Sequence, residues 1–297
     1  MSSRPEPESI AIIGLGLIGG SIARGLRADN YRGRLVGCVT TSDHAERACA
    51  LGLVDAAVTD PADAVRGASL VVVAVPVGAM AAVLADIAPA LAPDAVVTDV
   101  GSTKLSVIAD AKAALGAGIG RFVPGHPIAG TEHSGIDAGF ATLYRDRRVI
   151  LTPTPETDAD ALATVETLWQ RLGGRVSEMD PAHHDEVLAA TSHLPHVLAF
   201  ALVDTLARMA ERTEIFDYAA GGFADFTRIA SSDPQLWSDI VTANASAVLP
   251  VLERYIGDLE ALRGAIAAGD KEPLEASFGR AKHARDRFTQ SRNGTSE

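Results

Sequence analysis

The chain has 297 residues, more than the roughly 100 to 200 of one typical domain, so we expect two domains. Its net charge of −12 at pH 7 excludes nucleic acid and anionic membranes as main partners, because its surface would repel phosphate groups. Cys38 and Cys49 are too few for a disulfide framework, and no apolar run approaches the roughly 20 residues of a membrane span. The N-terminus also carries no basic-then-apolar export signal, so we expect a cytoplasmic protein.

The first half of the chain alternates short β-branched runs with longer Ala-rich helical stretches. This alternation is typical of a parallel sheet that is covered by helices on both faces. The expected strands are residues 9–14, 34–39, 70–75, 95–100, 121–123 and 149–152. The expected helices are residues 20–28, 42–51, 62–66, 78–91 and 104–115. The strand at 70–75 is apolar throughout, which favours a central position in the sheet.

The pattern changes near residue 180. Before this point, residues 156–172 predict an amphipathic helix and residues 175–179 a short last strand. Beyond it we find only helical patterns, which are broken at Pro195, Gly221-Gly222, Asp233-Pro234 and Gly269. We therefore expect an α/β domain over residues 1–180 and an all-α domain over residues 181–297.

Three glycines, Gly14, Gly16 and Gly19, follow the first strand and open the first helix. In this context the spacing predicts a Rossmann-type dinucleotide-binding turn in a doubly wound parallel sheet, because glycines allow close approach of a pyrophosphate to the backbone. The N–H groups at the helix start and the helix dipole also favour an anion there. The candidate cofactor-binding residues are Gly14, Gly16, Leu17, Ile18, Gly19, Thr40, Thr41, Ser42, Val75, Pro76 and Ser102.

The end of the second strand bears on the choice between NAD and NADP. NAD-binding folds usually carry an acidic residue there, whereas this chain has Val39, followed by Thr40, Thr41 and Ser42. Without the carboxylate, a 2′-phosphate is not repelled and the hydroxyl groups could donate to it, so the sequence favours NADP. No arginine is adjacent, although Arg47 could supply the charge. A plain polar loop with Ser42 capping the next helix is the alternative interpretation.

Two polar segments, residues 99–104 and 125–132, lie at the carboxyl ends of predicted neighbouring strands, where open α/β sheets bind ligands. Flanking glycines and Pro127 would hold His126 on a tight, rigid turn that faces the cofactor. Histidine is the side chain best suited to accept a hydroxyl proton near neutral pH. Taken alone, a loop histidine is more often a hydrogen-bonding residue without a chemical role.

Three motifs stand in a fixed order along the chain. They are His126-Pro127-Ile128-Ala129-Gly130-Thr131-Glu132, Ser192-His193-Leu194-Pro195-His196 and Gly221-Gly222-Phe223-Ala224-Asp225-Phe226-Thr227-Arg228-Ile229-Ala230. Together with the glycine turn, they resemble the prephenate/arogenate (cyclohexadienyl) dehydrogenase family over nearly the whole chain. The resemblance implies oxidative decarboxylation of prephenate and/or arogenate to 4-hydroxyphenylpyruvate and/or tyrosine, with hydride transfer to NAD(P), in tyrosine biosynthesis.

The resemblance also implies roles for single residues in the reaction. His126 would accept the proton of the ring hydroxyl, and Ser102 would hydrogen-bond near that hydroxyl and His126. Arg228 would hold a substrate carboxylate, since its planar fork makes two parallel charge-assisted hydrogen bonds. Without the family match, an ion pair of Arg228 with Asp225 or Asp233 would be the favoured interpretation.

Further candidate residues line the implied substrate pocket. Ser192 and His196 are four apart, so on a helix that Pro195 bends or begins they face the same side. The resemblance places both in the pocket and puts Thr131 and Glu132 at its entrance. This last pair could equally start a helix over residues 134–140.

Several alternatives remain open at this stage. A metal site built from His183, His184, His193 and His196 has no recognised ligand spacing, and we expect no metal. Another Rossmann-plus-helical reductase, of the β-hydroxyacid dehydrogenase or imine reductase type, would usually rely on a lysine in the helical domain. A non-catalytic NAD(P)-binding regulator would not need His126, Ser102 and Arg228 together.

The Ala- and Leu-rich stretches 197–210 and 241–262 bear on oligomeric state. A helical domain of this size is too small to cover both within one copy. We therefore expect a homodimer through this domain, and the family resemblance implies the same.

Overall fold

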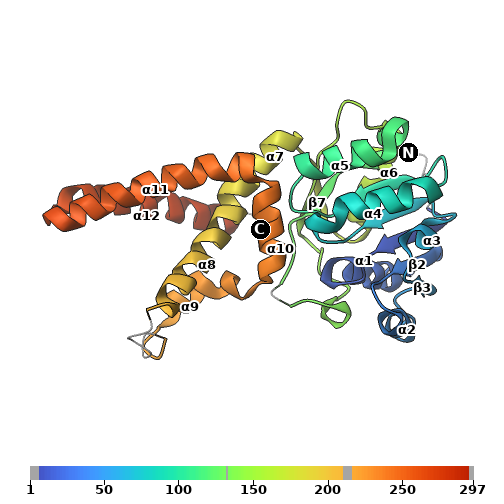
Figure 1. Ribbon diagram of the computed structural model, residues 1–297, viewed down its shortest axis with the longest axis horizontal. Coiled ribbons are helices and arrows are strands. Elements are labelled where there is room, and N and C mark those ends of the chain that lie inside the picture. The colour runs from blue at the N-terminus through green and yellow to red at the C-terminus, as the bar shows by residue number, and fades with distance from the viewer. Residues whose placement is uncertain (1–6, 132, 210–215, 294–297) are drawn as a thin grey trace. The chain divides into compact units, whose positions relative to one another are not determined.

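The computed structural model describes residues 7–131, 133–209 and 216–293. Its internal contacts divide the chain into one compact unit that ends at Val248 and a second that begins at Leu249. The first unit therefore holds both the α/β part and the first helices that follow it (Figure 1). A boundary at residue 180 stays a prediction.

A six-stranded parallel sheet forms the centre of the first unit, with strand order β3-β2-β1-β4-β5-β6. This arrangement confirms the expected Rossmann-type α/β fold. The strands are β1 (Ser9–Ile13), β2 (Arg34–Cys38), β3 (Ala56–Val58), β4 (Leu70–Val73), β5 (Val96–Asp99) and β6 (Phe122–Val123). The helices around them are α1 (Leu17–Ala28), α2 (Ser42–Ala50), α3 (Pro61–Val65), α4 (Met80–Ile87), α5 (Leu105–Leu115) and α6 (Ala159–Arg171).

Alternation along the strands places side chains in two cores, one on each face of the sheet. On β1, Ile10 and Ile12 join the core that contains α1 and α6. Ala11 and Ile13 join the core that contains α3, α4 and α5. All four residues of β4 are fully buried, as expected for a central strand that is covered on both faces.

A second sheet, which we did not predict, carries the segment around His126. Its strands are β7 (Gly125–Pro127), β8 (Arg148–Leu151) and β9 (Arg175–Glu178), with β7 antiparallel to β8 and β8 parallel to β9. His126 pairs with Ile150 in the middle of β7. The prediction of a tight turn at His126 is therefore wrong, because the segment forms a strand that pairs with β8.

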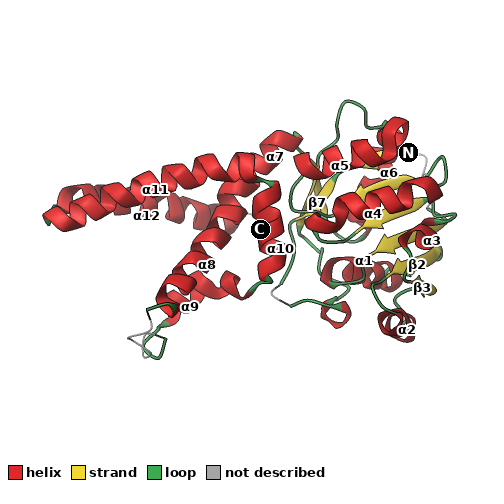
Figure 2. Cartoon of the chain, viewed as in Figure 1, coloured by secondary structure: helices red, strands yellow, loops and turns green. Residues whose placement is uncertain are grey.

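Beyond β9, the described residues form helices that are joined by short loops and turns (Figure 2). They comprise α7 (Pro181–Leu188), a π-helical turn (Ala189–His193), α8 (Leu194–Ala207), α9 (Gly221–Thr227), a 3-10 turn (Arg228–Ser231) and α10 (Pro234–Ala243). Helix α10 packs closely on the turn after β4, since a Cβ atom on Gly78 would lie only 2.4 Å from Oδ2 of Asp239. This contact brings helical residues to the carboxyl end of the parallel sheet.

One continuous helical stretch, Pro181–Ala207, is long and apolar enough to cross a membrane by length and composition. The expectation that no run approaches this length is therefore wrong. The expectation failed because it counted uninterrupted apolar residues, whereas the hydropathy of the whole stretch tolerates scattered polar ones. Core helices of soluble proteins meet the same test, and this stretch carries the buried polar side chains of His184, Asp185 and His193.

The second unit contains most of α11 (Ala245–Ala268) and all of α12 (Lys271–Asn293). The two helices are separated at Gly269, which has a φ of +66°. None of residues 249–290 is fully buried. The second unit therefore has no core of its own among these residues.

Candidate active site

The glycine turn between β1 and α1 has the geometry of a dinucleotide-binding loop. Gly14 has a φ of +93°, and a Cβ atom there would lie 2.5 Å from the carbonyl oxygen of Ala74. A Cβ atom on Gly19 would lie 1.9 Å from the carbonyl oxygen of Gly14, so glycine is required for the helix to approach the strand. A Cβ atom on Gly16 would have no neighbouring atom within 4 Å, so there is open space at the start of α1. This space and the unpaired N–H groups of a helix that begins at Leu17 suit a pyrophosphate.

The region predicted to bind the adenosine ribose follows β2. Val39 is buried, while Thr40, Thr41 and Ser42 are exposed. Thr41 caps α2, because its hydroxyl accepts a hydrogen bond from the backbone N–H three residues on. Thr41 rather than Ser42 is therefore the capping residue.

Arg47, the cation nearest in sequence to this region, has a partner. Its Nη2 atom donates to Oδ1 of Asp137 at 2.8 Å, and both side chains are more than half exposed. On the other side of the glycine turn, Val75 lies beside Gly14, and Pro76 leads into the 3-10 turn Val77–Ala79. Val75 and Pro76 thus lie where the parallel strands end.

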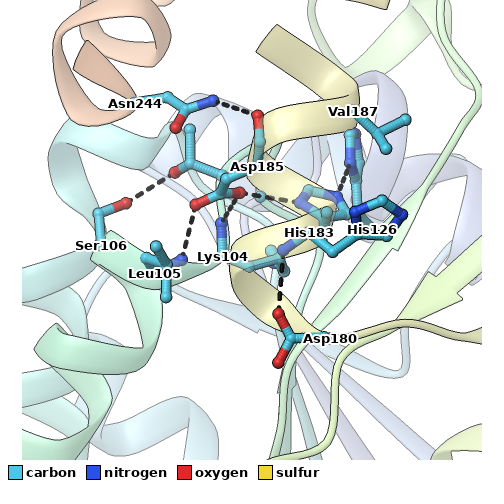
Figure 3. Close-up of polar contacts among 12 residues, drawn as sticks. Lys104, Leu105, Ser106, His126, Asp180, His183, Asp185, Val187 and Asn244 are labelled. Carbon is cyan, nitrogen blue, oxygen red and sulfur yellow. Dashed lines mark hydrogen bonds and ion pairs between the residues drawn. The ribbon is translucent and has the colours of Figure 1, made fainter. Parts of the chain in front are cut away.

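His126 is buried and joined to a chain of polar side chains (Figure 3). Its Nδ1 atom lies 2.9 Å from Nε2 of His184, and the two rings meet edge to face. Nδ1 of His184 in turn lies 2.8 Å from Oδ1 of Asp185. In the sequence, His184 stood out only as a member of a rejected metal site, and no motif pointed to Asp185.

Asp185 connects this chain to the start of α5. Its two carboxylate oxygens accept hydrogen bonds from the backbone N–H groups of Lys104, at 2.8 Å, and Leu105, at 2.9 Å. Because α5 has no capping side chain of its own, the Asp185 carboxylate supplies the cap and also faces the positive end of the helix dipole. The Asp185 carbonyl accepts a further hydrogen bond from Nδ2 of Asn244.

A buried ion pair fixes the residue before His126. Nζ of Lys104 donates to Oδ2 of Asp99 and to the carbonyl oxygen of Gly125, and neither charged side chain is exposed. Oδ1 of Asp99 accepts from the N–H of Gly125 at 3.1 Å. Both polar backbone groups of Gly125 are thereby held by the end of β5 and the start of α5, which positions His126 at the carboxyl edge of the parallel sheet.

Burial governs the protonation of this cluster. It lowers the pKa of His126 well below 6.5, and the neighbouring His184 and Lys104 lower it further. Burial also lowers the pKa of Lys104, although Asp99 opposes the shift. For Asp185, burial raises the pKa, but hydrogen bonds from His184, Leu105 and Lys104 outweigh it and leave the pKa below its usual value. His126 is therefore neutral near pH 7 and can accept a proton.

His193, which belongs to the second sequence motif, lies in the same region. It is fully buried, and its Nδ1 atom lies 3.1 Å from Nδ2 of Asn244. Burial lowers its pKa to about 4, and its neighbours include His184, His196 and the backbone of Ser102. Among the described residues, Ser102 makes no side-chain hydrogen bond with His126.

A second group of predicted residues meets at the start of α8. Nδ1 of His196 donates to the carbonyl oxygen of Ser192 at 2.8 Å, and the His196 ring stacks on Trp237 with centroids 3.3 Å apart. Burial lowers the pKa of His196, and the positive charge of Arg228 contributes to the same shift. Arg228 is exposed and begins the 3-10 turn after α9. Its positive charge is close enough to act on His196. No sequence motif pointed to Trp237.

The predicted pocket entrance is described only in part. The hydroxyl of Thr131, which is exposed, accepts a hydrogen bond from the N–H of His133 and so closes a local turn. Glu132 lies outside the described residues. The segment that follows forms only a 3-10 turn, Ile136–Ala138, in place of a longer helix. Within the described parts of the chain, no cluster of three or more His, Cys, Asp or Glu side chains could hold a metal ion.

A Rossmann-type sheet, an open glycine turn and a buried neutral histidine at the adjacent strand ends define a class of protein, the NAD(P)-dependent dehydrogenases. Comparison with known families specifies the class further. Residues 22–178 match the nucleotide-binding domain of prephenate dehydrogenase, and residues 180–280 match its dimerization domain. The chain belongs to the prephenate dehydrogenase family.

Individual relatives agree with this assignment. The chain is 48% identical to the cyclohexadienyl dehydrogenase of Zymomonas mobilis, over 93% of this chain and 94% of the relative. It is 34% identical to the prephenate dehydrogenase of Bacillus subtilis, over 94% of this chain and 76% of the relative. The crystal structure of Aquifex aeolicus prephenate dehydrogenase with hydroxyphenyl propionate and NAD+ matches with a TM-score of 0.89 and 37% identity, covering 96% of this chain and all of the other. The family and enzyme class expected from the sequence are confirmed.

Proposed function

We propose that this chain oxidatively decarboxylates prephenate, arogenate or both, with hydride transfer to NAD(P), as a step of tyrosine biosynthesis. One observation carries the proposal. A neutral, buried imidazole, His126, lies where β5 and β6 end, in the same region as the open glycine turn after β1. A dehydrogenase that oxidises an alcohol needs this combination, because proton removal from the hydroxyl must accompany hydride loss from its carbon.

The reaction balances with one base and one hydride acceptor. The hydroxyl proton of the cyclohexadienol goes to His126, and the hydride on the same ring carbon goes to the nicotinamide, which is the chemistry that the cofactor supplies. The C–C bond to the ring carboxylate breaks, carbon dioxide leaves, and its bonding electrons complete the aromatic ring. Aromatisation makes the step effectively irreversible.

The second group of residues fits the carboxylates of such a substrate. Arg228 is an exposed cation whose charge reaches His196, and we propose that it holds a carboxylate through paired hydrogen bonds. Ser192 and His196 would line the same pocket, with Ser102 close to the reacting hydroxyl. We also propose that Thr131 and Glu132 shape its entrance, Glu132 being outside the described residues.

The finer choice of cofactor is proposed from the end of β2. We propose that NADP is favoured over NAD, because buried Val39 replaces the usual acidic residue and exposed Thr40 and Ser42 present hydroxyl groups. Arg47 could contact a 2′-phosphate only by leaving Asp137. Equal or better turnover with NAD would contradict this preference.

A steady-state matrix of the two substrates against the two cofactors tests the proposed reaction. We expect NAD(P)H formation with at least one cyclohexadienol and none with simple hydroxyacids. The variants His126→Ala and Arg228→Ala serve as controls, the first expected to lower kcat and the second to raise KM. Unchanged activity in His126→Ala would refute the proposed base, and turnover of hydroxyacids alone would indicate a different reductase.

We further propose that the protein is a cytoplasmic homodimer with a functional boundary near residue 180. The matched dimerization-domain model over residues 180–280 and the absence of fully buried residues in 249–290 support the dimer. The hydrogen bonds of His184, Asp185 and His193 support a location of the helical stretch Pro181–Ala207 inside a soluble protein.

A further inference from the structure

Asp185 and His184 form a hydrogen-bonded relay that ends on His126. Asp185 is ionised, since its pKa is held below the usual value, and an ionised carboxylate only accepts hydrogen bonds. The proton between Asp185 and His184 must then be on Nδ1 of His184. In a neutral ring this leaves Nε2 of His184 as an acceptor.

The same logic fixes the proton on the next ring. Nε2 of His184 and Nδ1 of His126 are 2.9 Å apart, so they share one hydrogen bond. If Nε2 of His184 accepts, Nδ1 of His126 must donate. The lone pair of His126 is then on Nε2, the ring nitrogen on the far side from His184.

We propose that Asp185, acting through His184, holds His126 in the Nδ1–H tautomer and thereby leaves Nε2 as the proton acceptor of the reaction. This proposal rests on the proposed function, but it concerns two positioning residues rather than the base itself. The arrangement is chemically similar to the carboxylate–histidine pairs of hydrolase triads, with a second imidazole inserted between carboxylate and base. It also links the base to the fold, because the same carboxylate caps α5.

Burial makes the relay effective. The side chain of His184 is 0% exposed and that of Asp185 is 2% exposed, so water does not compete for their hydrogen bonds. The groups that act on His126 are His184, Lys104 and His193, and the positive charge of Lys104 is paired with Asp99. When His126 accepts a proton, the positive charge can pass to His184, which directly contacts Asp185.

Three variants of the full-length protein separate the relay from the helix cap. Asp185→Asn removes the carboxylate and weakens the cap of α5. His184→Phe keeps the cap but gives Nδ1 of His126 no acceptor. His184→Gln keeps the cap and also offers Nδ1 of His126 an acceptor, since the glutamine side-chain carbonyl can accept the same hydrogen bond.

The tautomer is measured directly by ¹⁵N NMR of the histidine rings, with the His126 signals assigned by comparison with a His126→Gln variant. In the unaltered protein we expect Nδ1 of His126 to carry the proton. We expect the Nε2–H form to become populated in Asp185→Asn and His184→Phe and the original form to return in His184→Gln. An Nε2–H tautomer in the unaltered protein, or an unchanged tautomer in both Asp185→Asn and His184→Phe, would overturn the proposal.

Kinetics provide the second measurement. We expect kcat to fall by roughly 10²-fold or more in Asp185→Asn and His184→Phe, with KM changed by less than about 3-fold. His184→Gln should recover most of the loss. The matched controls are Glu186→Gln and His183→Gln, which alter exposed neighbours on the same helix and should leave kcat unchanged. Equal losses in the controls and the relay variants would contradict a positioning role.

The two proposals can fail independently. If the unaltered protein turned over neither cyclohexadienol, the proposed function would be refuted while the substrate-free NMR result would still decide the relay. If the tautomer followed Asp185 but kcat did not, the positioning role would be refuted, while turnover of a cyclohexadienol by the unaltered protein would leave the proposed function in place.

Discussion

At the scale of single residues, the protonation of His126 sets the pH range of the proposed reaction. A base must be unprotonated to accept a proton, and burial together with His184 and Lys104 lowers the pKa of His126. The protonated, inactive form therefore predominates only at pH values well below 6.5. An enzyme whose base was an exposed histidine would instead lose half of its activity near pH 6.5.

We predict that kcat/KM is constant from pH 8 down through about pH 6.5 and falls only at lower pH, as His126 becomes protonated. His126→Ala should lower kcat by roughly 10²- to 10⁴-fold and remove this acidic limb. Initial rates across the pH range, with thermal unfolding as a check on folding, test both statements. A midpoint at or above pH 6.5 that disappears in His126→Ala would contradict the lowered pKa.

Arg228 is expected to act on substrate binding and on the titration of His196. In Arg228→Gln, loss of a charge-assisted contact should raise KM roughly 10- to 100-fold with little change in kcat or cofactor affinity. The positive charge of Arg228 contributes to the lowered pKa of His196, so its removal should raise that pKa. Steady-state kinetics and NMR titration of the ring check the two effects separately. An unchanged KM would remove Arg228 from the proposed carboxylate site.

At the scale of elements, the sequence predicted the parallel sheet well because its strands are strongly apolar and its turn is rich in glycine. β4 and the turn at Gly14 are examples, since the apolar run of the one and the glycine spacing of the other are visible in the local sequence. β3 and β7 were missed because their pairing with β2 and β8 is not visible in their own residues. Pairing of His126 with Ile150 cannot be deduced from the residues around His126.

The candidate site shows the same division between local and distant information. His126, His196 and Arg228 were found because each belongs to a recognisable motif. His184 and Asp185 have no motif, and their role depends on contacts with residues 58 to 81 positions away in the chain. In the sequence, only the adjacency of two titratable residues, His184 and Asp185, shortly after Asp180-Pro181 could have pointed to this role.

The turn between β1 and α1 offers a paired test of cofactor binding against folding. In Gly16→Ala, the new methyl group meets no protein atom, so stability should stay within about 1 kcal/mol while cofactor affinity falls about 10-fold or more. In Gly19→Ala, the methyl group would clash with the carbonyl oxygen of Gly14, so stability itself should fall by about 1 to 3 kcal/mol. Chemical denaturation and fluorescence titration with NADPH distinguish the two effects. Unaltered affinity in Gly16→Ala would argue against a pyrophosphate at this turn.

At the scale of the whole molecule, the charge of −12 opposes the binding of a substrate that carries two carboxylates in the case of prephenate. Local cations must therefore outweigh a repulsive surface. Lys104 is paired with Asp99 and fully buried, so its role is structural. Arg228 is exposed and near His196, which makes it the better placed of the two for the substrate.

The apolar surface of α11 leads to a test of the proposed homodimer. Leu249, Ile256, Leu259 and Ile266 are 46% to 66% exposed, and their spacing of seven, three and seven residues puts them on one side of the helix. A second copy of the chain would cover such a stripe.

We predict that the unaltered protein is a dimer at micromolar concentration and that Ile266→Glu shifts it towards monomer by placing a charge in the interface. Because Ile266 is 66% exposed, the substitution should not disturb folding of the single chain. Ala261→Glu adds the same charge on the opposite side of α11 and should leave the dimer intact. Light scattering with size-exclusion chromatography measures the mass of each variant. A monomeric unaltered protein would refute the dimer, and equal dissociation in both variants would refute the assignment of this face as the interface.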